Sequence, residues 1–219
     1  MIKRFIILLT ILSLCIACSK KTTIENDELR EAISQVWLDA DVAHEMLKQI
    51  DINSINYYEQ QRYRLAEAHL MLKRELKLPS GSDMDALAKY FESCGDEASV
   101  AEAYYIQGAY LNWLGKNTQA MQYLKKAESY PTTAIIKGMT YYKMGRICET
   151  EQLYDIALEN YKHALPYLEE AGLPLYLASV YRELGRNSQD VDKDAYFNKA
   201  LSAAQFIGDS ILQKEIRYA

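Results

Sequence analysis

The strongest constraint on the fold is a short pattern that occurs twice, 37 residues apart. "YYIQGAYLNWLG" begins at Tyr104 and "YYKMGRICETEQ" begins at Tyr141, and each places a glycine four residues after its first tyrosine. Residues three and four apart lie on one face of an α-helix. The interval therefore predicts a helical unit that is repeated along the chain.

The first unit covers residues 101–131 and contains two helices with matching faces. Large residues fill the space between these helices, while glycine and alanine let the two backbones approach closely. The second copy repeats the internal distances of the first, and a third begins well at Tyr181. The residues predicted to pack within the units are Tyr104, Gly108, Leu111, Ala120, Ala127, Tyr141, Gly145, Ala157, Ala164, Tyr181 and Gly185.

This order of residues resembles the tetratricopeptide repeat, in which an aromatic, a small residue, a large residue, an alanine, a large residue, an alanine and a proline follow one another. The resemblance implies an all-α fold: a right-handed superhelical α-solenoid of antiparallel helix pairs, with about four to five units, the first and last degenerate. In the third unit about one helical turn has been lost. Pro166 lies inside the second helix of its unit and is expected to end or kink it.

Helical periodicity extends beyond the clear repeats. The segment Asp39–Asp41 is expected to break the first apolar face into a hairpin, and no segment shows the sustained alternation of a strand. Glycine, proline and short polar breaks separate the later helices. The predicted helices cover about residues 57–76, 98–114, 117–129, 132–150, 153–171, 174–186 and 191–207.

The N-terminus reads as a targeting segment. "MIKR" supplies positive charge, "FIILLTILSL" is a short apolar run, and "CIACSKK" follows. This resembles a bacterial lipoprotein signal, cut before a lipid-modified Cys18; the alternative is an ordinary secretory signal. The predicted organisation is a signal peptide over residues 1–17, an anchor and tether over 18–28, degenerate helical repeats over 29–96, and repeats over 97–219 (101–131, 138–169 and 174–207) with a short C-terminal helix.

Helical repeats behind such a signal also resemble the repeat lipoproteins of Bacteroides-type bacteria. Ser19 follows the anchor, where an aspartate would resemble an inner-membrane retention signal. The resemblance therefore implies a lipid-anchored protein of the outer membrane that faces the periplasm. Each buried acyl methylene contributes about 0.8 kcal/mol, so a multiply acylated cysteine would hold the chain firmly to the membrane.

Composition argues against several classes of function. The chain has 25 Lys+Arg against 30 Asp+Glu, and a nucleic-acid binder would carry a basic stripe. Its three histidines are widely separated, and no glycines form a phosphate-binding loop. We therefore expect no enzyme activity, no catalytic residue, no metal site, no cofactor and no nucleic-acid partner. Cys94 and Cys148 are expected to be free thiols.

A binding surface is predicted from geometry. In tetratricopeptide repeats, residues one step past each packing stripe line the concave groove. The candidate groove residues are Tyr105, Asn112, Tyr142, Arg146, Glu149, Arg182 and Arg186. Tyrosine rings and guanidinium groups suit an extended peptide or an acidic chain. The alternative is that the tyrosines simply pack between repeats.

The resemblance implies a non-enzymatic, membrane-anchored scaffold of the bacterial cell envelope that binds a protein or peptide partner in this groove. Two alternatives remain: a ligand-sensing or glycan-binding helical-repeat lipoprotein, and an accessory lipoprotein of outer-membrane assembly. Fold alone does not choose among them.

Overall fold

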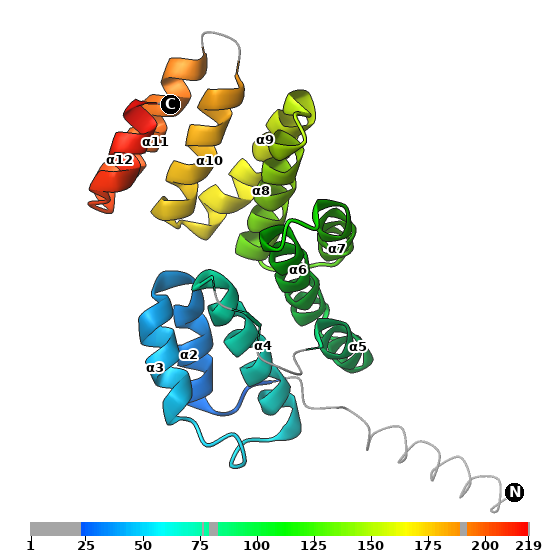
Figure 1. The fold of residues 1–219 in the computed structure, drawn as a ribbon. Helices are drawn as coiled ribbons and strands as arrows, with labels where there is room; N and C mark the ends of the chain where they lie inside the picture. The colour runs from blue at the N-terminus through cyan, green and yellow to red at the C-terminus, as the bar shows by residue number, and fades with distance from the viewer. Residues whose placement is uncertain (1–22, 76, 79–82, 189–191, 219) are drawn as a thin grey trace, which may run out of the picture.

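The computed structural model describes residues 23–75, 77–78, 83–188 and 192–218, and over these residues the chain is all-helical, with no strand. The signal peptide and Cys18 lie outside the described residues. The helices, labelled in Figure 1, are α2 (Asp27–Leu38), α3 (Ala40–Gln49), α4 (Tyr57–Lys73), α5 (Met84–Cys94), α6 (Glu97–Trp113), α7 (Asn117–Ser129), α8 (Ala134–Thr150), α9 (Tyr154–Ala171), α10 (Pro174–Asn187), α11 (Asp192–Phe206) and α12 (Ser210–Arg217). None of them combines the length and the apolar character needed to cross a membrane.

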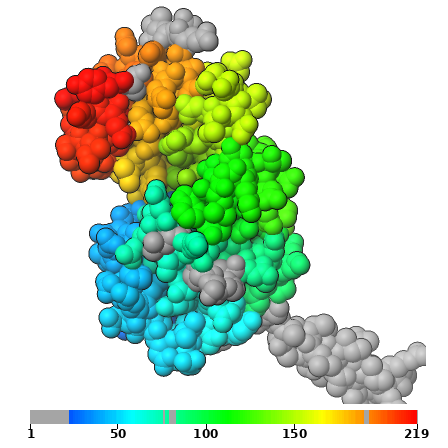
Figure 2. Space-filling view, in the orientation of Figure 1, coloured from blue at the N-terminus to red at the C-terminus, as the bar shows by residue number. Residues whose placement is uncertain are grey.

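Helices that follow one another in the chain pack side by side, with close contacts in the pairs α2/α3, α6/α7, α8/α9 and α10/α11. Figure 1 shows α5 to α9 following one another along the molecule, after which the chain curves so that α10 lies near the α2–α3 hairpin. Helices α2 and α10 touch, because the Trp37 and Tyr176 rings lie with their centroids 5.6 Å apart. Figure 2 shows the yellow start of α10 close to the blue N-terminal hairpin.

Short polar residues set several helix boundaries. Asp39 ends α2 and begins α3, where its carboxylate accepts hydrogen bonds from the backbone N–H groups of Asp41 and Val42. Asn56 and Glu59 form a reciprocal capping box at the start of α4. The predicted break at Asp39 is therefore confirmed, and its cause is a side chain that satisfies otherwise unpaired helix donors.

In each of the pairs α6/α7, α8/α9 and α10/α11, a side chain of the second helix packs against a glycine of the first. A Cβ atom at Gly108 would lie 2.8 Å from Leu124 Cγ, and one at Gly145 would lie 2.6 Å from Tyr161 Cε1. In both pairs the contacted residue follows its glycine by 16 positions. Gly138, two turns before Gly145, makes the same kind of contact with Leu168. Because any side chain at these positions would collide with its neighbour, glycine sets the distance between the paired helices.

The α10/α11 pair keeps this contact with a shorter spacing. Gly185 faces Phe197, which follows it by only 12 residues, and a Cβ at Gly185 would lie 2.9 Å from the ring. The difference of four residues equals about one helical turn. This agrees with the turn that the sequence lacks in its third unit.

Tyr104 and Tyr141, the first tyrosine of each copy of the repeated pattern, have equivalent surroundings. The Tyr104 and Tyr130 rings lie 6.0 Å apart, and the Tyr141 and Tyr167 rings lie 6.1 Å apart, with the same separation along the chain. Both first tyrosines are half-buried, whereas Gly108, Gly145 and the alanines of the predicted packing set are buried. The repeated sequence thus corresponds to repeated packing.

The abundance of tyrosine over phenylalanine has a structural cause. Several rings pack between helices while their hydroxyl groups donate hydrogen bonds to carboxylates on a neighbouring segment. These pairs are Tyr58–Asp96, Tyr123–Asp85, Tyr130–Glu92, Tyr141–Glu128, Tyr161–Glu149 and Tyr181–Glu169. The bond to Asp85, together with burial, raises the pKa of Tyr123 to about 12. Phenylalanine would fill the same space but leave each carboxylate without this donor.

The predicted helix 153–171 is confirmed, because α9 passes through Pro166 and continues to Ala171. Of the two effects expected of Pro166, an end or a kink, the end does not occur. Proline removes one backbone donor, so the carbonyl one turn earlier loses its partner. Pro166 is exposed, which lets water satisfy that carbonyl. The following turn is held by Leu168, which is fully buried against Gly138.

Replacing Gly145 with leucine should lower the free energy of unfolding by about 1–3 kcal/mol or more through overpacking. Tyr161 cannot move aside easily, because it is fully buried and its hydroxyl is bound to Glu149. The measurement is urea-induced unfolding followed by circular dichroism. Thr150→Ala, an exposed change in the same helix, should stay within about 0.5 kcal/mol of wild type. Equal stability of Gly145→Leu and wild type would contradict the assigned contact.

Candidate functional site

A cavity of about 310 Å³ lies where the curved path brings five helices together. We call it the central cavity. Its lining residues are Trp37 from α2, Leu72 and Lys73 from α4, Glu75 just after α4, Tyr105, Ala109, Asn112 and Trp113 from α6, Met139 and Lys143 from α8, and Tyr176 from α10. This volume is at the lower end of the range of about 300–1,000 Å³ for ligand sites and suits one or two side chains of a partner.

Aromatic rings form much of the cavity wall. Trp37 is central among them: its ring lies 6.1 Å from that of Tyr105 and 5.6 Å from that of Tyr176. Trp113, at the end of α6, is 45% exposed and stacks on Tyr110. The wall of the cavity is therefore buried at Tyr105 and exposed to solvent at Trp113.

A buried polar group holds Trp37 in place. The tryptophan packs edge-on against His69, with ring centroids 4.3 Å apart, and His69 is completely buried. His69 Nδ1 shares a hydrogen bond of 3.0 Å with Glu102, which also pairs with Arg62 at 3.3 Å. Although burial acts to raise it, the pKa of Glu102 is lowered by His69 and Arg62. The charged carboxylate thus fixes the histidine against which Trp37 rests.

Two lysines bring positive charge to the cavity. The Lys73 amine donates a 2.6 Å hydrogen bond to the carbonyl of Val36 and lies 5.6 Å from the Trp37 ring. Burial lowers the pKa of Lys73. Burial also lowers the pKa of Lys143, and the nearby charge of Arg146 lowers it further. Both amines are therefore held in surroundings that disfavour an uncompensated charge.

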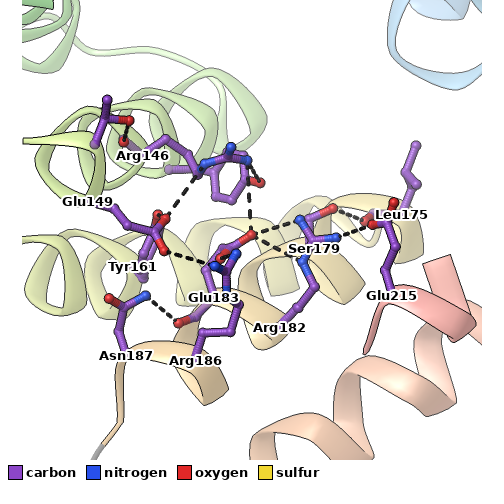
Figure 3. Close-up of polar contacts among 12 residues, drawn as sticks. Arg146, Glu149, Tyr161, Leu175, Ser179, Arg182, Glu183, Arg186, Asn187 and Glu215 are labelled. Atoms are coloured by element: carbon purple, nitrogen blue, oxygen red, sulfur yellow. Dashed lines mark hydrogen bonds and ion pairs between the residues drawn. The ribbon is translucent and has the colours of Figure 1, made fainter. Parts of the chain in front are cut away.

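A second set of charged residues, the arginine cluster, lies one turn further along α8 and on α10. It consists of Arg146, Arg182 and Arg186 with Glu149, Glu183 and Glu215, and Figure 3 shows how they converge. Glu183 is completely buried at its centre. Its carboxylate pairs with Arg182 at 2.8 Å and Arg186 at 3.3 Å, and it lies 4.0 Å from Arg146.

Every arginine of this cluster has a carboxylate partner within the chain. Glu149 approaches Arg146 and Arg186 and accepts a hydrogen bond of 2.9 Å from Tyr161. Glu215, on α12, accepts a 2.6 Å hydrogen bond from Arg182. The three positive charges are thereby balanced by three negative ones, and the cluster joins α8, α10 and α12 rather than presenting free cations.

The structure separates the predicted groove residues into these two neighbouring places. Tyr105 and Asn112 line the central cavity, whereas Arg146, Glu149, Arg182 and Arg186 belong to the arginine cluster. Tyr142 lies beneath the cluster, where its hydroxyl accepts a 3.4 Å hydrogen bond from Arg146. Tyr105 and Tyr142 are only 3% and 9% exposed, so their rings pack between helices, as the alternative expects.

Several residues of the site had only a weak signal in the sequence. Lys143 directly follows the predicted Tyr142, and Glu183 precedes Arg186 by the three residues that favour an ion pair on a helix. Trp37 and Tyr176 had no signal, because they meet only when the path curves back. Repeat spacing specifies neighbours in consecutive units, not contacts between distant ones.

Three other features were considered as sites of chemistry or binding: metal-ligating clusters, the cysteines and a second hollow. In the part of the chain that the structure describes, no three His, Cys, Asp or Glu side chains lie close enough together to hold a metal ion. Cys94 and Cys148 are free, as predicted. A larger hollow of about 830 Å³ beside α7 and α8 has a mainly apolar lining that includes Met121, Ile147 and Cys148, but it contains none of the predicted groove residues.

Comparison of the chain with protein-family models, curated proteins and solved structures found no match. The resemblance to tetratricopeptide repeats therefore depends on the spacings within this chain.

Truncating Glu183 should be costly, because it removes the buried carboxylate that three arginines share. We expect Glu183→Ala to lower the free energy of unfolding by about 3 kcal/mol. Glu215→Ala is the matched control: it removes another partner of Arg182, but one that is 56% exposed, and should cost no more than about 1 kcal/mol. Urea unfolding of both variants tests this, and equal losses would contradict the central role of Glu183.

Proposed function

We propose that this chain is a non-enzymatic, membrane-anchored scaffold of the bacterial cell envelope that binds a protein or peptide segment. Its helix pairs would form a tetratricopeptide-like, right-handed superhelical solenoid of about four to five units, with the concave face carrying the binding site. The regular glycine contacts in α6/α7, α8/α9 and α10/α11 support this arrangement. The close packing of the two helices within each of these pairs also agrees with it.

The observation that carries the binding proposal is the central cavity. Five helices contribute to its wall, and Trp37 and Tyr176, which are 139 residues apart, close one side of it. Enclosure by aromatic rings with a few polar groups is characteristic of sites that bind a ligand or peptide. Trp113 at the open side provides an aromatic contact of the type that dominates binding energy at interfaces.

The anchor places the scaffold at a membrane. Lipidation of Cys18 would hold residues 18–28 at the bilayer and leave the helices free to meet partners. We propose the periplasmic face of the outer membrane, on the basis of Ser19 and the absence of an acidic stretch after the anchor.

Glycan binding is the second candidate, and one observation favours it: Trp37, Tyr105, Trp113 and Tyr176 all line the central cavity. Sugars stack on exposed aromatic faces, but most of these rings already contact one another. The lysines in the cavity favour an acidic protein partner over a neutral sugar.

The site can be tested by crosslinking and affinity capture of the intact lipidated protein from cells. Trp113→Ser should reduce recovery of the partner by about fivefold or more, because losing an interface aromatic costs about 1 kcal/mol or more. Alanine at Tyr105 or Tyr142 is a poor choice, since truncating a buried ring costs about 3–5 kcal/mol of stability.

Leu114→Ser provides the control for this experiment. Leu114 adjoins Trp113 and is 44% exposed, close to the 45% of Trp113, but it does not line the central cavity. The Leu114→Ser variant should recover the partner within about twofold of wild type. Loss of the partner in both variants, or in neither, would argue against the central cavity as the site.

The anchor has its own test. Cys18→Ser should abolish incorporation of a fatty-acid label and move the protein from the membrane fraction to the soluble fraction, because the acyl chains supply the membrane affinity. Cys15→Ser, three residues earlier, should keep both the label and the membrane location. Unlabelled wild-type protein would instead support an ordinary secretory signal.

A further inference from the structure

The charges of the central cavity are not balanced as those of the arginine cluster are. Among the described residues, no carboxylate lies within 4.0 Å of the Lys73 or Lys143 amine, and Lys143 forms no hydrogen bond or ion pair there. Glu75 also lines the cavity, and its charge acts to raise the pKa of Lys143, against the effect of burial, but its carboxylate forms no ion pair within 4.0 Å with either lysine. Each arginine of the arginine cluster, by contrast, has a carboxylate oxygen within 4.0 Å. The lysines of the central cavity therefore have no carboxylate in close contact, whereas the arginines of the arginine cluster do.

Holding an amine in such a place is unfavourable unless it gains a partner. Removing a charge from water costs several kcal/mol when no counter-charge compensates. The aromatic wall around Lys73 already limits its access to water, with Trp37 at 5.6 Å and Tyr176 at 5.9 Å from the amine. A carboxylate entering this space would supply the missing negative charge where the local dielectric constant is low and attraction is strong.

We propose that the central cavity binds a carboxylate of the partner, an aspartate or glutamate side chain of a peptide segment, between the amines of Lys143 and Lys73, with the Trp37 and Tyr176 rings as its walls. The proposal rests on the proposed function, since it names the chemistry of the partner that the scaffold takes. The cavity volume of about 310 Å³ is adequate for one acidic side chain and its neighbour but not for a folded domain. Lys143 is the principal partner, because Lys73 is already hydrogen-bonded to Val36.

The arginine cluster is a less favourable site for an acidic segment than the central cavity. An acidic segment at the arginine cluster would have to compete with Glu149, Glu183 and Glu215 for each guanidinium group. In the cavity it would displace no internal ion pair. We therefore expect a carboxylate to bind with a more favourable free energy at the cavity lysines than at the arginine cluster.

The chain contains a convenient reporter for this site. It has two tryptophans, Trp37 and Trp113, and both line the central cavity. In a Trp113→Phe background the intrinsic fluorescence reports on Trp37 alone. The full-length chain in detergent would be titrated with the blocked tripeptide acetyl-Ala-Glu-Ala-amide and, separately, with acetyl-Ala-Gln-Ala-amide. The two peptides have nearly the same size but differ in charge.

We expect a saturable change in Trp37 fluorescence with the glutamate peptide and an affinity at least about tenfold lower for the glutamine peptide, which corresponds to about 1.4 kcal/mol. Lys143→Met should weaken binding of the glutamate peptide by a similar factor, whereas Lys143→Arg should retain most of it. Lys162→Met removes an exposed lysine of α9 and should have no effect. Equal responses to the two peptides, including no response to either, would overturn the proposal.

The comparison of the two peptides in the Trp113→Phe background needs no lysine variant, so the test remains decisive even if Lys143→Met folds poorly. Failure of this inference can also be told from failure of the proposed function. Partner capture that depends on Trp113, together with equal binding of both peptides, would overturn the carboxylate site alone. Selective binding of the glutamate peptide, together with capture that is insensitive to Trp113→Ser, would support the carboxylate site and count against the central cavity as the place where the protein partner is captured.

Discussion

Side chains of one helix pack directly against glycines of its partner helix, and the position of each glycine determines which side chain can lie there. In α8/α9, Gly138 faces Leu168 and Gly145 faces Tyr161. The contact at Gly145 places the Tyr161 ring so that its hydroxyl reaches Glu149. Glu149 in turn contacts Arg146 and Arg186. Because residue 145 has no side chain, Tyr161 can pack against α8. This packing determines where the ion-pair network between α8 and α10 forms.

The curvature of the whole chain has a second consequence, since it brings the first and later helices into contact. Trp37 on α2 reaches Tyr176 on α10, and a cavity remains between them and the inner helices. The Trp37 contact is supported from below by His69 and Glu102, which form a buried polar network. The hydrogen bond to Glu102 orients the His69 ring through Nδ1, whereas Nε2 of the same ring has no hydrogen-bond partner among the described residues. The wall of the cavity is therefore fixed by a network rather than by apolar contact alone.

The helices could be predicted closely from the sequence. The expected segments 117–129 and 153–171 correspond to α7 (Asn117–Ser129) and α9 (Tyr154–Ala171). Such segments have strong helical periodicity and clear end signals, which act over a few residues. Whether Pro166 ends α9 depends on exposure and on the packing of the next turn, and both come from tertiary structure.

What the amino-acid sequence determined by itself is the set of helices, the pairing of neighbours and the repeated packing at Gly108 and Gly145, because these depend on residue type and spacing within about 40 positions. Only the tertiary structure decided which charges are paired and which rings meet. Arg146 and Arg186 looked available in the sequence, but they share Glu183, whereas Lys143 has no such partner among the described residues. The contact of Arg146 with Glu183 and the contact of Trp37 with Tyr176 join helices that are not neighbours of the same hairpin, and no local sequence pattern encodes how those helices are placed.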